Sequence, residues 1–347
     1  MKMSAKITIG ILCIIAAASL SAVFGRQLDT KSSAGVRSNT ITPKPTPFEF
    51  QEMTIPYLRS QEYQSEITQE YMIANGSGYT SYRVSYFSEG FKIYGLLTVP
   101  TGDAPTGGWP AVIFLHGYIP PTIYKTTQQY AAYTDQLSKN GFVVFKPDFR
   151  GHDKSEGEAR GAYYSSDYVI DALHAYDALS KYPDVNPNGI GLWGHSMSGN
   201  ISMRVFAVRP TIPAVVIWAG AVYTYADMRE FSIQDGSYRP PPLNTQLQQR
   251  RQKLRELYGD FSADSWFWKQ VAITEYLSDL QGAVQIHHAV NDDVVNIGYS
   301  RNLLKLLEAA SVPHEVYEYP DGGHNIQGTA FITAFERTIA FFKQRLR

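Results

Sequence analysis

The stretch Ile190-Gly191-Leu192-Trp193-Gly194-His195-Ser196-Met197-Ser198-Gly199-Asn200 places a serine between a short apolar run and an amphipathic segment. The apolar run is typical of a buried strand, and the segment 197–208 has the pattern of a helix. A serine at such a junction occupies a tight strand-to-helix turn, which lifts its hydroxyl above the sheet in strained backbone geometry. Small residues must flank this turn, and Gly194 and Ser198 supply them.

The serine of this turn, Ser196, is the predicted nucleophile. The usual pattern is G-x-S-x-G, and this chain departs from it because Ser198 occupies the last position, with Gly199 after it. We expect the extra hydroxymethyl group to crowd the turn without preventing it. Because a helix begins at Met197, its backbone N–H is predicted to be one donor to a developing oxyanion.

After Pro110 the chain alternates short apolar runs with amphipathic segments, which is typical of strands buried on both faces between helices. The order predicts an α/β fold with a mostly parallel central sheet and right-handed crossovers. The stretch 82–99, broken at Ser88-Glu89-Gly90, predicts a β-hairpin at one edge of this sheet. The predicted strands occupy 111–115, 142–145, 190–193, 214–218, 284–287 and 315–319, and the predicted helices occupy 127–139, 167–181, 197–208, 299–309 and 329–346.

One segment, from about 223 to 282, interrupts this alternation and is predicted to form a small helical cap inserted over the sheet. Within it, residues 245–258 predict a charged helix. Its basic residues are interleaved with Gln and Leu, so we expect them to form a solvated face rather than a binding patch. These residues are Arg250, Arg251, Lys253 and Arg255.

Two later strand ends supply the partners of a serine nucleophile, which needs a base because its hydroxyl is hardly ionised at neutral pH. Asp292 and Asp293 follow the fifth predicted strand, and His324 follows the last one. In the α/β-hydrolase fold, serine, acid and histidine occur in this order along the chain. We therefore predict the catalytic triad Ser196, Asp292 and His324, and expect Asp293 to cap the next helix.

The second oxyanion donor is expected from the loop after the first parallel strand, where we assign the backbone N–H of Tyr118. His116 precedes the nucleophile in the chain and is predicted to be structural. His287 and His288 point to opposite faces of one strand and cannot clamp a metal together. We therefore expect neither a metal site nor a cofactor.

Composition limits the partners of the chain. The net charge of -1, from 31 basic and 32 acidic residues, gives no field that would steer a nucleic acid. The single cysteine, Cys13, lies in the N-terminal apolar run, so the rest of the chain has no internal disulfide. We expect a small-molecule or peptide substrate and no nucleic acid.

The N-terminal residues 1–25 predict either a cleaved signal peptide or an uncleaved membrane anchor, because basic residues precede an apolar run from 7 to 25. Either one directs the chain out of the cytoplasm, as a secreted or membrane-anchored protein. Residues 26–56 are rich in Ser, Thr and Pro, which predicts an unpacked linker. The catalytic domain, with its cap, is expected at 57–347.

From about residue 82 to its end, the chain resembles the catalytic domain of the prolyl oligopeptidase family and related α/β-hydrolase esterases. The resemblance implies that Ser196 is the nucleophile, Asp292 the acid and His324 the base. These are the roles already predicted from the residue types and their order. The family's large β-propeller has no counterpart in the residues before the match. The matching pieces are His116-Gly117, Asp148-Phe149-Arg150-Gly151-His152, Ser155-Glu156-Gly157, Gly194-His195-Ser196-Met197, Asn291-Asp292-Asp293-Val294-Val295 and Gly323-His324.

These features predict a serine hydrolase that cleaves a peptide or ester bond through an acyl-enzyme. A prolyl oligopeptidase-like serine peptidase is the first interpretation. The alternative is a carboxylesterase or deacetylase acting on carbohydrate or aromatic esters. A further alternative is a non-catalytic binding module, because the fold alone does not fix the function.

Overall fold

The computed structural model describes residues 46–231, 233–238 and 245–347. The predicted signal peptide or anchor at 1–25 lies outside these residues, as does most of the predicted linker. Within the described ranges, no helix combines the length and the apolar character needed to cross a membrane.

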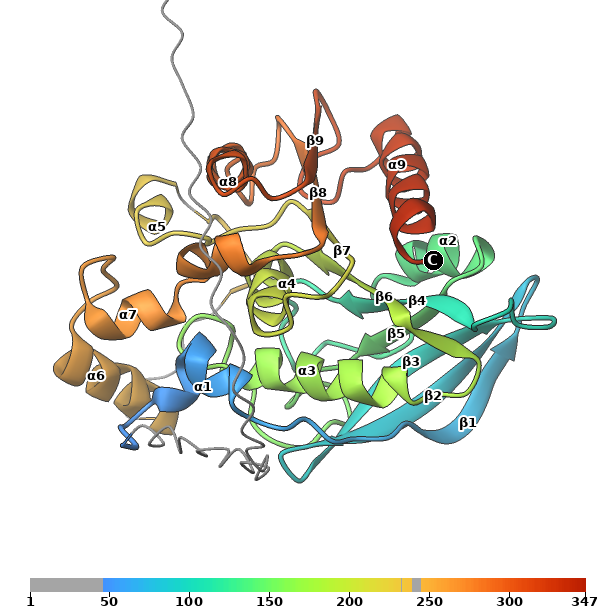
Figure 1. Cartoon of the computed structure of the whole chain (residues 1–347), viewed down its shortest axis with the longest axis horizontal. Helices are drawn as coiled ribbons and strands as arrows, with labels where there is room; N and C mark the ends of the chain where they lie inside the picture. Colours follow the sequence, from blue (N-terminus) through green and yellow to red (C-terminus); the bar gives the residue numbers. More distant parts are fainter. Residues whose placement is uncertain (1–45, 232, 239–244) are drawn as a thin grey trace, which may run out of the picture. The chain divides into compact units, whose positions relative to one another are not determined.

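A nine-stranded mixed sheet forms the centre of the fold (Figure 1). Strands β4 and β6 to β9 run parallel, and β5 is parallel to β4, whereas β1, β2 and β3 form an antiparallel edge that joins β5. In spatial order the strands are β1 (Thr68–Asn75), β2 (Tyr79–Ser88), β3 (Phe91–Pro100), β5 (Val143–Pro147), β4 (Trp109–Leu115), β6 (Val185–His195), β7 (Ala214–Trp218), β8 (Ala283–Ala289) and β9 (His314–Tyr319).

This topology confirms the predicted α/β-hydrolase fold, with its parallel sheet and edge hairpin. Strand β1 was not predicted. Every one of its residues is exposed. Its sequence therefore lacks the regular alternation of apolar and polar residues by which a half-buried strand is recognised.

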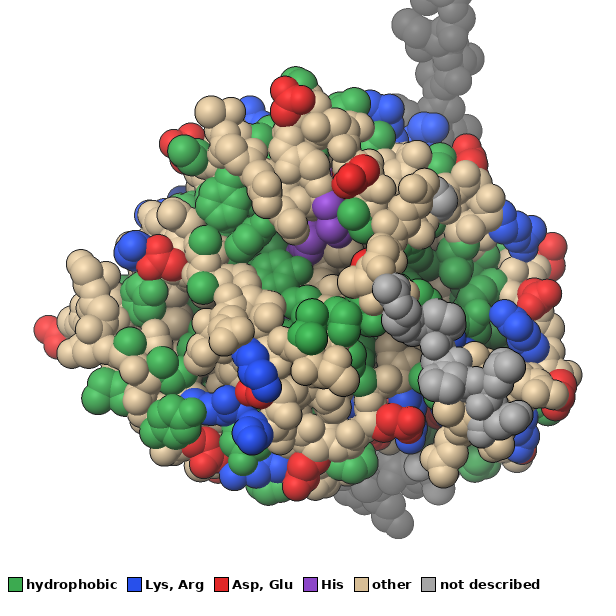
Figure 2. Space-filling view, turned by 180° about the vertical axis from the view of Figure 1, so that it is seen from behind, with side chains coloured by type: hydrophobic (Ala, Val, Ile, Leu, Met, Phe, Trp, Pro, Cys, Tyr) green, Lys and Arg blue, Asp and Glu red, His purple; other side chains and the backbone are tan. Residues whose placement is uncertain are grey.

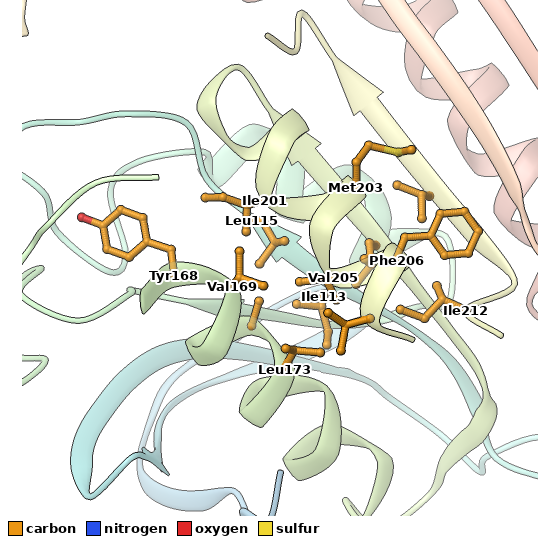
Figure 3. Close-up of a cluster of buried hydrophobic side chains, with 14 of the residues drawn as sticks. Ile113, Leu115, Tyr168, Val169, Leu173, Ile201, Met203, Val205, Phe206 and Ile212 are labelled. Atoms are coloured by element: carbon orange, nitrogen blue, oxygen red, sulfur yellow. The ribbon is translucent and has the colours of Figure 1, made fainter. Parts of the chain in front are cut away.

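Helices cover both faces of the sheet because alternate residues of each buried strand point to opposite sides. Ile113 and Leu115 of β4 pack with α3 and α4 (Figure 3), whereas Val112 and Phe114 pack in a second cluster with α2 and α9. The helices that flank the sheet are α2 (Ala131–Lys139), α3 (Asp167–Ser180), α4 (Met197–Val208), α8 (Gly298–Ala309) and α9 (Thr329–Arg345).

The predicted cap segment contains short helices between β7 and β8, which lie beside the sheet in Figure 1. They are α5 (Asp227–Glu230), α6 (Gln246–Tyr258), α7 (Trp266–Val271) and the 3-10 helix η2 (Ile273–Asp279).

The predicted linker is wrong in its last ten residues. The compact unit begins at Pro47, and the chain then forms the 3-10 helix η1 (Gln51–Met53) and helix α1 (Ile55–Arg59). Met53 is buried in a small cluster with the α6 and α7 residues Leu254, Phe267 and Trp268. Apolar residues directly after the proline-rich run therefore anchor this segment.

Helix α4 lies unusually close to the loop after β7, at Gly199. A Cβ atom at Gly199 would lie 2.7 Å from the Cα of Gly220 and 2.6 Å from the hydroxyl oxygen of Tyr223. Both distances are shorter than the contacts that carbon atoms make in folded proteins. Gly199 therefore sets the distance between the nucleophile helix and the sheet.

We predict that Gly199→Ala lowers the free energy of unfolding by about 1 to 3 kcal/mol, the usual cost of overpacking a core. Urea denaturation would measure it. The matched control is Gly236→Ala, since a Cβ atom at Gly236 meets nothing within 4 Å. Equal stability of the two variants would contradict the close approach of α4.

Candidate active site

Ser196 lies between β6 and α4 in the predicted turn, with backbone angles φ 54° and ψ -118°. A residue with a side chain rarely has a positive φ, so this conformation is strained. The N–H of Ser196 donates to the carbonyl of Trp218 at 2.9 Å, which fixes the turn against β7. A Cβ atom at Gly194 would come within 2.3 Å of the Ser202 hydroxyl, so glycine is required there.

Ser198, the departure from the usual pattern, has a role that the sequence did not predict. Its side chain is buried, and its hydroxyl donates to the carbonyl of His116 at 2.5 Å. The expected crowding is thus resolved by a hydrogen bond. This bond ties the nucleophile helix to the loop after β4.

The predicted acid and base lie in contact. The carboxylate oxygen Oδ2 of Asp292 accepts a hydrogen bond from Nδ1 of His324 at 2.9 Å. This bond leaves Nε2 of His324 as the nitrogen that can take up a proton. His324 and Ser196 both line a cavity of about 420 Å³, and Figure 2 shows histidine side chains in a hollow on this face.

Asp292 accepts four hydrogen bonds in all. Its Oδ1 accepts from the backbone N–H groups of Val294 and Val295 at 2.8 and 2.9 Å, and its Oδ2 accepts from His324 and from Nε2 of His288 at 3.0 Å. Burial by itself would raise the pKa of Asp292, but the hydrogen bonds from both histidines and the charge of His324 lower this pKa well below its usual value. Asp292 therefore stays ionised and fixed in orientation.

Sequence reasoning missed His288 as part of this site. Its Nε2 lies 3.0 Å from two acceptors, Asp292 Oδ2 and the carbonyl of Val295, so this nitrogen carries the proton, and Nδ1 accepts from the hydroxyl of Ser300 at 2.7 Å. His288 and Asp292 are four residues apart at a strand end, and only the turn between them brings their side chains together.

The prediction that Asp293 caps the next helix is wrong. Helix α8 begins at Gly298, five residues later, and the N–H of Gly298 donates to the side chain of Asn296 at 2.8 Å. The turn that folds around Asp292 occupies the intervening residues.

A second chain of hydrogen bonds joins the loop after β4 to the loop that carries His324. The Nε2 of His195 donates to the carbonyl of His324 at 2.9 Å, so its Nδ1 accepts, and the hydroxyl of Tyr130 donates to it at 2.8 Å. The Tyr130 oxygen in turn accepts from the N–H of Gly117 at 2.9 Å. Burial lowers the pKa of His195 to about 3, so this ring stays neutral and the chain of bonds keeps its direction.

The two predicted oxyanion donors flank Ser196. Met197 is the first residue of α4, and the first N–H groups of a helix have no acceptor within it. Tyr118 follows Gly117, whose backbone comes so close that a Cβ atom there would lie 3.2 Å from the Cβ of Ser196. This close approach explains why a glycine precedes Tyr118.

Two cavities meet at Ser196, and they differ in chemistry. Ser196, Tyr118 and Asp235 line both. The first cavity contains His324 and mainly polar or hydroxyl-bearing side chains, including Gln129, Tyr130, Tyr133, His195, Ser237, Asn325 and Gln327. The second, of about 400 Å³, contains Met197 and mainly apolar or aromatic side chains, including Ala162, Tyr163, Tyr164, Val222, Met228, Phe231, Ile233, Val295 and Tyr299.

His116 and His287 are both buried. His116 is in contact with the carbonyl of Gly117 at 2.7 Å, and His287 is in contact with the hydroxyl of Tyr319 at 2.8 Å. Within the described ranges, no group of three or more His, Cys, Asp or Glu side chains is arranged to hold a metal ion.

Comparison with known proteins gives a family match and a set of related folds. Residues 110–328 match the family model described as "Serine aminopeptidase, S33". The chain is 24% identical over 249 residues to the uncharacterized peptidase YtmA of Bacillus subtilis (strain 168), covering 70% of this chain and 85% of that protein.

Two solved structures share the fold. An acetyl xylan esterase from Paenibacillus sp. R4 has a TM-score of 0.59 at 14% identity, covering 84% of this chain and 92% of that one. The dipeptidyl peptidase 4 of Porphyromonas gingivalis has a TM-score of 0.56 at 18% identity, covering 78% of this chain but only 36% of that one. At these identities the likeness establishes the fold.

We predict that Asp292→Asn lowers kcat by about 10³-fold or more, because an amide in this position no longer holds the histidine in the required tautomer. Steady-state kinetics on an activated ester would measure the loss. Asp293→Asn is the matched control and should leave kcat unchanged, since the structure gives Asp293 no bond to His324. Equal losses in the two variants would contradict the assignment of the acid.

We also predict that Tyr130→Phe lowers kcat about tenfold with little change in KM, because both Gly117 and His195 lose a hydrogen-bond partner while the ring stays in place. The control is Tyr79→Phe, which removes a hydroxyl that donates at 2.8 Å to Asp135 of α2, the helix that begins directly after Tyr130. An unchanged kcat in Tyr130→Phe would show that the chain of bonds does not position the site.

Proposed function

Because the chain belongs to the serine aminopeptidase S33 family of α/β-hydrolases, we propose that it transfers an acyl group from a polar leaving group to water through an acyl-Ser196 intermediate. The observation that carries this proposal is the position of Ser196 at the junction of two chemically different cavities, of which only one contains His324.

The proposed reaction has two halves. In the first, Nε2 of His324 takes the proton of Ser196 as Oγ attacks the substrate carbonyl carbon, and the N–H groups of Met197 and Tyr118 bind the oxyanion. His324 then gives the proton to the leaving group as its bond to carbon breaks. In the second half, His324 takes a proton from water, the resulting hydroxide attacks the acyl carbon, and the proton returns to Ser196 as the acid is released.

The position of His324 indicates which cavity takes the leaving group of the substrate and which takes the acyl group. Since the base must protonate the leaving group, the leaving group occupies the cavity that contains His324. The acyl group then occupies the second cavity. We therefore propose a polar leaving group, such as an alcohol that carries further hydroxyl groups, and an acyl group with apolar or aromatic character.

An ester is the bond that these cavities favour. An aminopeptidase substrate carries an ammonium group on its acyl side, and the acyl cavity contains the guanidinium group of Arg251, which repels a cation. Peptide hydrolysis is the second candidate. It is favoured by the family description, by the peptidase relative, and by the carboxylate of Asp235, which lines both cavities and can accept a bond from an ammonium group.

Kinetics on matched substrates test the proposal. We expect hydrolysis of p-nitrophenyl butyrate by the full chain and a loss of about 10³-fold or more in kcat in Ser196→Ala. Alanyl-p-nitroanilide and its N-acetyl derivative should be cleaved equally slowly, because no free amine is required. Retained esterase activity in Ser196→Ala would contradict the nucleophile. A preference for the free amine that disappears in Asp235→Asn would place peptide hydrolysis first.

A further inference from the structure

One basic residue of α6, Arg251, does not lie on the expected solvated face. It lines the acyl cavity, which Ser196 also lines, and the carbon of its guanidinium group lies 4.5 Å from the centre of the Tyr164 ring. The three other basic residues of this helix are all ion-paired. These pairs are Arg250 with Glu52, Lys253 with Glu49, and Arg255 with Asp260.

Arg251 has no carboxylate partner among the described residues. Its Nη1 donates to the hydroxyl of Tyr238 at 3.5 Å, a long bond, and its Nε is buried without a hydrogen-bond partner in the described part of the chain. Burying a charged donor without a partner is costly, and a guanidinium group has no neutral form at physiological pH. Arg251 is therefore ready to bind an anion that enters the cavity.

Neither of the other charged groups of the acyl cavity, Arg160 and Asp235, forms an ion pair with Arg251 among the described residues. Arg160 lies 3.3 Å from Glu158 and 3.6 Å from Asp167, so its charge is matched. Asp235 lines both cavities, as Ser196 does. Its Oδ1 accepts hydrogen bonds from the N–H and the hydroxyl of Ser237. Arg251 lines only the acyl cavity.

We propose that Arg251 binds a carboxylate at the distal end of the acyl group, so that the preferred substrates are monoesters of dicarboxylic acids. The planar fork of a guanidinium group matches the two oxygens of a carboxylate, and stacking on Tyr164 holds this fork in place. The apolar walls of the cavity accommodate the methylene groups or the ring between the two ends. This inference rests on the proposed function, because it assumes acylation of Ser196.

The test compares neutral and anionic acyl groups of similar length. The substrates are the p-nitrophenyl esters of butyric and hexanoic acid and the p-nitrophenyl monoesters of succinic, glutaric and adipic acid. We expect kcat/KM to be highest for one of the monoesters. Arg251→Gln should lower kcat/KM for that monoester about 10- to 100-fold, as expected for a charge-assisted hydrogen bond, and leave the neutral esters within about twofold. Lys253→Gln, which removes one positive charge from the same helix, is the control and should change neither.

A binding measurement guards against a variant that folds poorly. Free glutarate or adipate should inhibit hydrolysis of the neutral ester more strongly than butyrate or hexanoate does, and Arg251→Lys should retain part of this difference. Neutral esters hydrolysed at equal rates by wild type and Arg251→Gln, without any preference for a monoester in wild type, would overturn this inference and leave the proposed function intact. Failure to hydrolyse any ester would instead overturn the proposed function.

Discussion

Ser196 has a strained backbone conformation with φ 54°, and the elements packed around it hold it in this conformation. Gly194 and Gly199 let α4 approach the sheet, the N–H of Ser196 is fixed to β7, and the hydroxyl of Ser198 fixes α4 to the end of β4. A strained conformation costs of the order of 1 to 3 kcal/mol and persists only where packing over-determines it. Here the packing places Ser196 and Met197, the first residue of α4, on the wall of the same cavity.

Hydrogen bonds of three histidines also fix the loops after β8 and β9 relative to the turn at Ser196. His324 and His288 both donate to Asp292, so the loop after β8 and the loop after β9 share one carboxylate. His195, directly before the nucleophile, holds the backbone of His324 from the other side and receives a bond from Tyr130. The base is thus held at its ring by Asp292 and at its carbonyl by His195, which limits its motion relative to Ser196.

Much of this arrangement could be predicted from the sequence, because it depends on local signals. The turn at Ser196 is a strand, a serine between small residues and a helix in succession, and the order of serine, acid and histidine follows from the strand ends. The second partner of Asp292 could not be predicted, since the contact with His288 depends on the path of a turn rather than on spacing. Arg251 was predicted to lie on a solvated face because the basic residues of its helix are interleaved with Gln and Leu. Its environment instead includes Tyr164, which is far away in the chain. The exposed strand β1 and the packed residues after Pro47 lack the periodicity or composition that would identify them.

The proposed reaction requires Ser196 to be a nucleophile that His324 activates. The most direct measurement is the mass of the full chain after treatment with a fluorophosphonate, followed by peptide mapping of the modified residue. We predict one adduct per chain, located on Ser196 and greatly slowed in His324→Ala. No adduct on a folded sample, or an adduct on another serine, would show that Ser196 is not the activated nucleophile.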